Sequence, residues 1–396
     1  MTVIRHATIY TADTVIPDGT LRIIGDRIAV IGTHQGSVEA REAEQVKARG
    51  ELDLDGRGLV AIPGLIDLQC NGIAGYDVLD ADPETIRAMV SVLPRYGCTA
   101  VLPTIVTAAH ETLTHGLRAI AQVSRTPGAG TAILGTHMEG PWLSPAHRGA
   151  HQAQYLRPFD RAECAALLDA AQGTLRLVTL APEVPGNAEA VQLLAGTGTL
   201  VSLGHSGADY DAALSAARHG ARMATHLFNA MGPLHHRAPG LAGAALTIPG
   251  LVPGIIPDGH HLHPAIVRLA ARARGPYDLV VVTDSVPVAG TPPGLYTWQD
   301  RQVHWDGETV RLSDGTLAGS GLTPIEALRR YISITGLSLA EALPAMTSTP
   351  ARLLGQEGIR GTLAPGARGD VVLLTQDLQV HTTLVGGEVV YQAAPA

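Results

Sequence analysis

Eight short apolar segments rich in β-branched residues, all between residues 60 and 285, constrain the fold more than any other feature of the chain. They cover residues 60–69, 99–106, 132–139, 175–183, 199–206, 221–229, 251–259 and 278–285. Helix-like segments, such as 83–97 and the Ala-rich 207–221, lie between them. Eight strand–helix alternations favour a (β/α)8 barrel over a doubly wound sheet. Residues 322–336 would supply the last barrel helix.

The two ends of the chain have a different pattern, in which short strand-like segments alternate with turns. Residues 1–58 and 357–396 both show it. Neither end alone provides enough strands for a convincing core. We therefore predict an α/β protein with two parts. A TIM-like (β/α)8 barrel occupies residues 59–356, and a small discontinuous β-sandwich domain is formed by residues 1–58 and 357–396.

The composition of the chain argues against some classes of binding partner. A net charge of -8 over 396 residues leaves no basic face for nucleic acid. The chain has no apolar run long enough to span a bilayer, and its start lacks the apolar core of a signal peptide. Three widely spaced cysteines form neither a disulfide framework nor a CxxC metal motif. These features predict a cytoplasmic protein that binds neither nucleic acid nor membrane.

Polar residues follow the predicted strands, and in a (β/α)8 barrel the C-terminal strand ends carry the active site. They are Gln69, Asn71, His137, Glu139, His205, His226, Asp258, His260, His261 and Asp284. One carboxylate and two histidines from different strands are typical of a catalytic zinc site with an open position for water, and a further carboxylate can act as its base. Taken singly, each residue could be structural, such as an Asp that caps a helix. Their convergence favours the metal site, with His137 as a core or supporting residue.

Seven motifs carry a resemblance to a known family. They are "PGLIDLQCNG", "HMEGPWLSPAHRGAH", "GHSGADYDAA", "THLFNAMGPLHHRAPGLAGAAL", "IPDGHHLHP", "VVTDSVPVAG" and "LAGSGLT". Because these motifs occur in this order and spacing, the chain resembles the amidohydrolase superfamily over nearly its whole length. Within the superfamily it resembles the N-acetylglucosamine-6-phosphate deacetylases.

The chain departs from the superfamily at one point, after the first barrel strand. The superfamily usually carries His-x-His there, whereas this chain has Gln69 and Asn71. Neutral amides are poor zinc ligands compared with imidazole. The resemblance therefore implies a vacant second metal site, and one divalent ion, Zn(II) or Fe(II), on Glu139, His205 and His226. The alternative is that the two amides only satisfy buried backbone groups.

The resemblance also implies roles for individual residues. Asp284 would act as general base and then general acid, and His151 would polarise the acetamide carbonyl. The sugar phosphate would be held by Asn229, Ala230, His261 and Arg237, the last reaching across a homodimer interface from the neighbouring subunit. The sugar pocket would be lined by Leu317, Ala318, Gly319 and Ser320. No role is assigned to His235, His236 or His260.

The implied reaction is hydrolysis of N-acetylglucosamine 6-phosphate to glucosamine 6-phosphate and acetate. Three alternatives stay open on the sequence. The substrate could be the galacto epimer, because no residue that reads the epimeric hydroxyl is identified. A nucleobase or hydantoin amidohydrolase would not need a phosphate-binding arginine in "LHHRAPG". A non-catalytic scaffold with the same fold would not need to retain Glu139, His205, His226 and Asp284 together.

Overall fold

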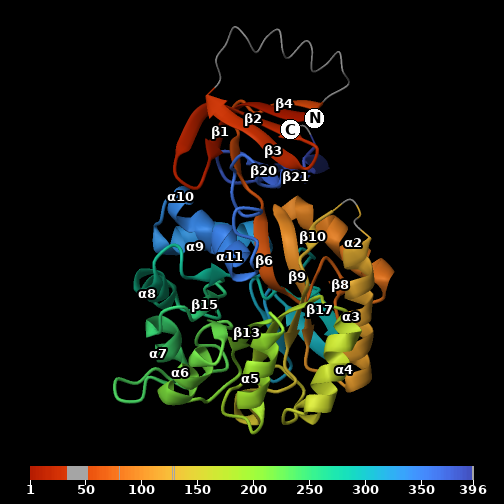
Figure 1. Cartoon of the computed structure of the whole chain (residues 1–396), viewed down its shortest axis with the longest axis vertical. Helices are drawn as coiled ribbons and strands as arrows, with labels where there is room; N and C mark the ends of the chain where they lie inside the picture. The colour runs from red at the N-terminus through yellow and green to blue at the C-terminus, as the bar shows by residue number, and fades with distance from the viewer. Residues whose placement is uncertain (34–51, 80, 127, 129, 395–396) are drawn as a thin grey trace.

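The computed structural model describes residues 1–33, 52–79, 81–126, 128 and 130–394. Its main part is a parallel barrel surrounded by helices, and a separate mixed sheet lies at one end of the molecule, next to both chain termini (Figure 1). The predicted fold class is confirmed in both respects.

Eight parallel strands form the barrel. In chain order they are β6 (Leu65–Cys70), β9 (Cys98–Val106), β11 (Thr136–Glu139), β12 (Leu175–Leu180), β13 (Leu200–Leu203), β14 (Ala221–Ala224), β15 (Val252–Ile255) and β16 (Val280–Val281). Beyond β16 the chain returns to β6. The Asp284 N–H donates to the Gln69 carbonyl at 2.9 Å, and the Asn71 N–H donates to the Ser285 carbonyl at 2.8 Å. These two bonds bring the first and last strand ends together, next to the site described below.

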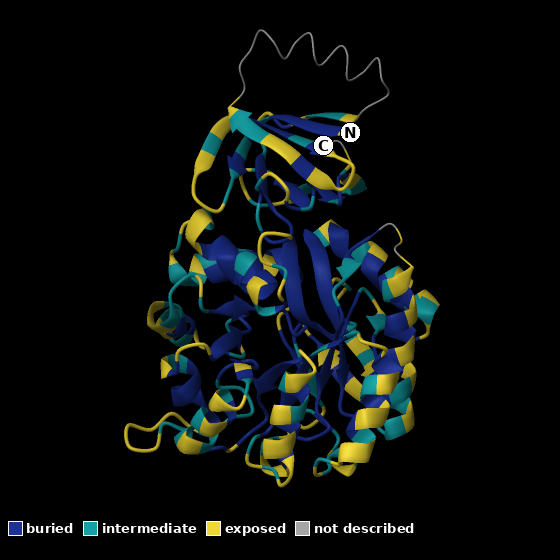
Figure 2. Ribbon diagram, in the orientation of Figure 1, coloured by how far each residue is buried: buried dark blue, intermediate teal, exposed yellow. Residues whose placement is uncertain are grey.

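The helices cover the outside of the barrel, one after each strand. They are α2 (Pro83–Val92), α3 (His110–Arg125), α4 (Arg161–Ala171), α5 (Asn187–Gly196), α6 (Tyr210–Arg218), α7 (Gly240–Thr247), α8 (Pro264–Arg274) and α9 (Pro324–Thr335), followed by the short α10 (Leu339–Ala342) and α11 (Ser348–Leu353). Asp82, Asp160 and Asp209 cap α2, α4 and α6 by accepting a backbone N–H of the first turn. Figure 2 shows buried inner faces and exposed outer faces. None of the described helices is long and apolar enough to cross a membrane.

The mixed sheet combines both chain ends. Its strands are β1 (Thr2–Tyr10), β2 (Val15–Ile24), β3 (Arg27–Thr33), β4 (Leu52–Asp55), β5 (Val60–Pro63), β20 (Val371–Leu374), β21 (Val380–Val385) and β22 (Glu388–Gln392). Strand β5 joins the two ends, because it pairs parallel with β1 and antiparallel with β20. Residues 34–51 of the predicted 1–58 unit lie outside the described residues.

The segment 60–69, predicted as one barrel strand, is two strands separated by Gly64. Strand β5 pairs in the mixed sheet, and β6 begins the barrel. A Cβ atom at residue 64 would lie 2.0 Å from the Thr99 hydroxyl oxygen, so only glycine fits at this crossing. The four residues of β5 lie beyond the predicted 58/59 boundary, but they pair with strands of the two chain ends. The exact domain limits stay a prediction.

A small antiparallel sheet lies between β16 and α9, and the sequence analysis did not predict it. It consists of β17 (Gly294–Trp298), β18 (Arg301–Trp305) and β19 (Val310–Leu312). An apolar cluster that includes Val286, Trp298 and Val303 holds this inserted sheet on the segments that follow β16. The insertion therefore adds a wall at the C-terminal end of the barrel. Shorter pairings are made by β7 (Gly72–Ile73) with β8 (Tyr76–Asp77), and by β10 (Ala132–Ile133) with β9.

Candidate active site

Four of the predicted residues leave the barrel at the C-terminal ends of different strands. Glu139 is the last residue of β11, and His205, His226 and Asp284 follow β13, β14 and β16. The last three have positive φ angles of 49°, 29° and 48°. Such backbone conformations are unfavourable for residues other than glycine, at a cost of about 1–3 kcal/mol each, and they concentrate at functional sites.

Glu139, His205 and His226 present three donor atoms to one point. The Glu139 Oε1 atom lies 3.2 Å from His205 Nε2 and 3.1 Å from His226 Nε2, and the two Nε2 atoms are 3.0 Å apart. Ligands about 2.0–2.1 Å from a tetrahedral zinc ion lie roughly 3.3 Å from each other. The His205 Nδ1 atom is 3.0 Å from the His147 carbonyl, which directs the Nε2 lone pair of a neutral ring toward the cluster. This buried group is therefore suited to a single divalent metal ion.

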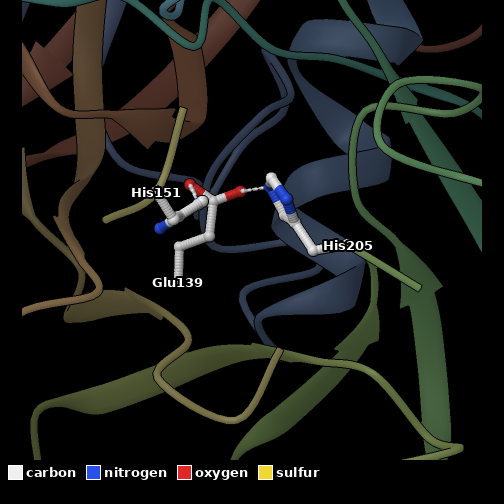
Figure 3. Close-up of side chains that lie close together, drawn as sticks. All are labelled: Glu139, His151 and His205. Carbon is white, nitrogen blue, oxygen red and sulfur yellow. Dashed lines mark hydrogen bonds and ion pairs between the residues drawn. The ribbon is translucent and has the colours of Figure 1, made fainter. Parts of the chain in front are cut away.

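His151 forms a second, overlapping group with Glu139 and His205, whose donor atoms all lie within 4.8 Å of one another (Figure 3). Its Nε2 atom is 3.7 Å from Glu139 Oε2, farther than either of the other two histidines is from the Glu139 carboxylate. The shorter distances favour His226 as the third donor and leave His151 at the edge of the cluster. Burial lowers the pKa of His151 to about 3, so its imidazole is neutral near pH 7.

Gln69 and Asn71 donate to the site carboxylates. The Gln69 Nε2 amide lies 3.1 Å from Glu139 Oε1 and 3.0 Å from Asp284 Oδ1. The Asn71 Nδ2 amide lies 2.8 Å from the same Asp284 oxygen and 3.2 Å from the Ser285 carbonyl. Only one of these four contacts is to a backbone group. The need to satisfy buried backbone groups therefore does not explain the presence of these two amides. The two amides instead hold the site carboxylates, Glu139 and Asp284.

The Asp284 carboxyl has an environment that suits proton transfer. Burial and the nearby Glu139 carboxylate raise its pKa to about 7, against the opposing effects of His226, His261 and Asn71. A carboxyl that exchanges a proton near neutral pH can act as both base and acid. A cation bound beside it would lower this pKa.

One cavity of about 250 Å³ is lined by Asn71, Glu139, His151, His205, His226 and Asp284. It also contains the predicted substrate-binding residues Asn229, Ala230, His261, Leu317 and Gly319. Ala318 and Ser320 do not line it. Ala318 packs in the apolar cluster of the inserted sheet, and the Ser320 hydroxyl donates to the Thr283 carbonyl at 2.6 Å.

Arg237 lies apart from the cavity of its own chain. It occupies an exposed loop, where its Nη1 atom is 2.9 Å from His236 Nε2. The His235 and His236 rings stack nearby with centroids 4.2 Å apart.

Two other histidines take supporting or peripheral positions. His137 is buried, with ring nitrogens 2.8 Å from the Thr179 hydroxyl and 3.3 Å from the Thr104 hydroxyl, so it lies in the barrel core as expected. His260 lies 3.5 Å from the exposed Glu308.

Sequence reasoning missed the part that the inserted sheet and Asp258 play in this cavity. Trp298 and Gln299 belong to the hairpin of the inserted sheet and line the cavity together with Thr316. The alternating residues of 294–312 were a signal that could have identified this hairpin. Asp258 was noted without a role. Its Oδ2 atom lies 2.6 Å from His261 Nδ1, so it orients the ring at the cavity wall.

Asp67, inside β6, is a buried carboxyl that the sequence analysis also passed over. The Thr283 hydroxyl donates to its Oδ2 at 2.6 Å, and the Gln69 N–H donates to its Oδ1 at 3.2 Å. Burial nevertheless raises its pKa from the ordinary 3.8 to about 6. The folded protein therefore holds this proton more tightly than the unfolded chain does.

We expect this carboxyl to make the free energy of unfolding decrease as the pH rises from about 4 to about 6, by roughly 3 kcal/mol. The stabilisation is complete below the unfolded pKa and is lost through the folded pKa. Asp67→Asn should remove this component and flatten the curve relative to the wild type. Urea denaturation of both proteins between pH 4 and 7 measures the difference. Parallel curves would contradict the prediction.

Comparisons with known proteins agree with this geometry. The model of the amidohydrolase family matches residues 60–390. An N-acetylgalactosamine-6-phosphate deacetylase of Escherichia coli O157:H7 is 36% identical over 98% of both chains. An N-acetylglucosamine-6-phosphate deacetylase of Mus musculus is 40% identical over 86% of this chain and 85% of its own.

Solved structures show the same similarity. The N-acetylglucosamine-6-phosphate deacetylase of Pasteurella multocida superposes with a TM-score of 0.90 at 31% identity, over 98% of this chain and 99% of its own. A variant of the Mycobacterium smegmatis deacetylase in complex with N-acetyl-D-glucosamine-6-phosphate gives the same TM-score, identity and coverage.

Proposed function

The chain belongs to the amidohydrolase family, and on that premise we propose that it hydrolyses N-acetylglucosamine 6-phosphate to glucosamine 6-phosphate and acetate. One observation carries the proposal: Glu139, His205 and His226 converge beside Asp284 in a single cavity. A scaffold without activity would have no need to keep a buried carboxyl charged next to two imidazoles. The test is release of glucosamine 6-phosphate and acetate by the purified protein.

Glu139, His205 and His226 would hold one divalent ion, which we propose to be Zn(II), with Fe(II) as the alternative. Carboxylate and imidazole ligands suit both ions. When bound, such an ion supplies Lewis acidity and lowers the pKa of water. The donor distances given above support one site. We propose that Gln69 and Asn71 mark a vacant second metal site, and the amide contacts of both side chains to Asp284 support this.

Asp284 would accept the proton of the attacking water and return it to the leaving amine. Its Oδ1 atom already receives two amide N–H groups, so the water must approach the other oxygen. His151, neutral and buried at the cavity wall, would donate an N–H to the acetamide carbonyl as negative charge develops there. The side chains of Asn229 and His261, with the Ala230 backbone, would hold the sugar phosphate.

N-acetylgalactosamine 6-phosphate is a second candidate substrate. The relative from Escherichia coli O157:H7 that bears this activity in its name is 36% identical over 98% of this chain. Assays of both epimers under identical conditions decide between the two. The larger kcat/KM identifies the substrate.

We propose that the enzyme is a homodimer in which Arg237 reaches the neighbouring cavity and binds the substrate phosphate. Its exposed loop follows β14 beyond Asn229, and its guanidinium can bind a phosphate in a bidentate manner. We propose that the reaction takes place in the cytoplasm. The three cysteines are free and buried, as suits a reducing compartment.

Arg237→Ala should raise KM for the 6-phosphate substrate and leave the weak activity on unphosphorylated N-acetylglucosamine unchanged. A hydrogen bond to a charged group contributes about 1.5–3 kcal/mol, so kcat/KM should fall roughly tenfold to a hundredfold. Steady-state kinetics on both substrates measure the effect. Equal losses on the two substrates would remove the phosphate role.

The cross-subunit position of Arg237 has its own test. Mixing Arg237→Ala protein with Asp284→Asn protein should restore some activity, because a mixed dimer combines one intact catalytic site with an intact Arg237 from its neighbour. An active enzyme that is strictly monomeric by light scattering would contradict the shared site.

A further inference from the structure

We propose that Gln299, at the tip of the inserted hairpin, donates its side-chain amide to a ring hydroxyl of the bound sugar and thereby sets substrate specificity. The inference rests on the proposed function and adds a residue that reads the sugar.

The hairpin tip has an unfavourable backbone conformation. Strands β17 and β18 pair up to Trp298 and Arg301, so only Gln299 and Asp300 form the turn. Their φ angles are 52° and 59°. A two-residue turn with both φ angles positive normally uses Asn-Gly or Asp-Gly, and neither residue here is Asn or Gly. Strain of this kind persists where the surrounding structure requires a particular side chain to be presented.

The orientation of the Gln299 amide follows from its neighbour. The Arg301 Nη2 atom lies 3.2 Å from Gln299 Oε1. A guanidinium has no acceptor, so the amide oxygen must face Arg301. The Gln299 Nε2 group is thereby left as a donor, and it has no hydrogen-bond partner among the residues that the structure describes. Gln299 itself is only 9% exposed and lines the cavity that contains Asp284.

The hairpin is attached to the loop that carries His151. The Arg301 Nη1 atom donates to the Ala150 carbonyl at 2.8 Å, and the Gln152 amide is 3.5 Å from the Gln299 carbonyl. One arginine therefore orients the Gln299 amide and also holds the residue before His151. This arrangement places the amide at a defined position relative to the reacting groups.

The chemistry of this wall suits a sugar hydroxyl. Trp298, 5% exposed, is an apolar residue that lines the cavity together with Gln299. A neutral amide donor next to an indole matches the mixed polar and apolar surface of a pyranose ring. A phosphate would instead call for charged donors.

The test compares wild type and Gln299→Leu on N-acetylglucosamine 6-phosphate, its 3-deoxy and 4-deoxy analogues and its galacto epimer. The wild type should lose about three- to tenfold in kcat/KM on one of the deoxy analogues, as expected for one neutral hydrogen bond. Gln299→Leu should lose a similar factor on the parent substrate. The kcat/KM values of this variant for the parent substrate and for that analogue should then agree within about twofold.

Two further variants separate recognition from folding. Gln299→Met keeps the length of the side chain but can neither donate to nor strongly accept from a hydroxyl, so it should lose the same discrimination. Asp300→Asn changes the exposed neighbour at the same turn and should keep the wild-type ratio. Thermal unfolding and metal content check that each variant is folded.

Three outcomes would overturn the inference: a wild type indifferent to both deoxy analogues, unchanged discrimination in Gln299→Leu and Gln299→Met, or loss of discrimination in Asp300→Asn as well. A wild type that releases no amine from either epimer contradicts the proposed function itself, before any variant is compared.

Discussion

Asp284→Asn is expected to retain the metal ion and to lower kcat by about 10⁴ or more. General acid–base catalysis contributes on the order of 10²–10⁴, and here one carboxyl is assigned both proton transfers. The amide oxygen of Asn can accept the same N–H groups from Gln69 and Asn71, so the geometry of the site is preserved. What the variant loses is the ability to take up a proton. Single-turnover kinetics and metal analysis measure the two effects separately.

Asp67→Asn is the matched control for this variant. Asp67 is also a buried carboxyl at the β6–β16 junction, and burial raises its pKa as well, but it does not line the cavity. We expect this control to change the pH dependence of unfolding and to leave kcat within a few-fold of the wild type. An Asp284→Asn protein with normal metal content and wild-type kcat would exclude Asp284 as the base.

Metal content is expected to be about one ion per chain, and removal of the ion is expected to abolish turnover. Substituting Glu139, His205 or His226 by Ala should reduce occupancy to a small fraction of one, because a site that loses one of three ligands binds poorly. Even outer partners of metal ligands typically contribute 10- to 100-fold in affinity. Elemental analysis after dialysis against a chelator, followed by Zn(II) or Fe(II) addition, measures occupancy and recovery.

His151→Asn is the informative control, because His151 belongs to the overlapping group with Glu139 and His205. If His226 is the third ligand, His151→Asn keeps the ion and loses most of its turnover. If His151 is the ligand, the ion is lost instead. Two ions per chain, both in the barrel mouth, would contradict the reading of Gln69 and Asn71 as a vacant site.

The sequence by itself determined the fold class and the composition of the site. Strand and helix periodicity are local properties, so eight alternations were enough to predict the barrel. In a barrel the ends of parallel strands meet at one face, so the residues that follow them could be named before any distance was known. Glu139, His205, His226 and Asp284 were found in this way, and the structure brings them together as expected.

Features that depend on contacts between distant segments of the chain were decided by the tertiary structure alone. The division of 60–69 at Gly64 depends on Thr99 of the next strand, and the cavity wall at Gln299 depends on a hairpin that packs from outside the barrel. The pKa of Asp284 depends on burial and on Glu139, 145 positions away in the chain. Desolvation and charge–charge interactions act through space. Sequence patterns record neighbours along the chain, so they do not reveal these effects.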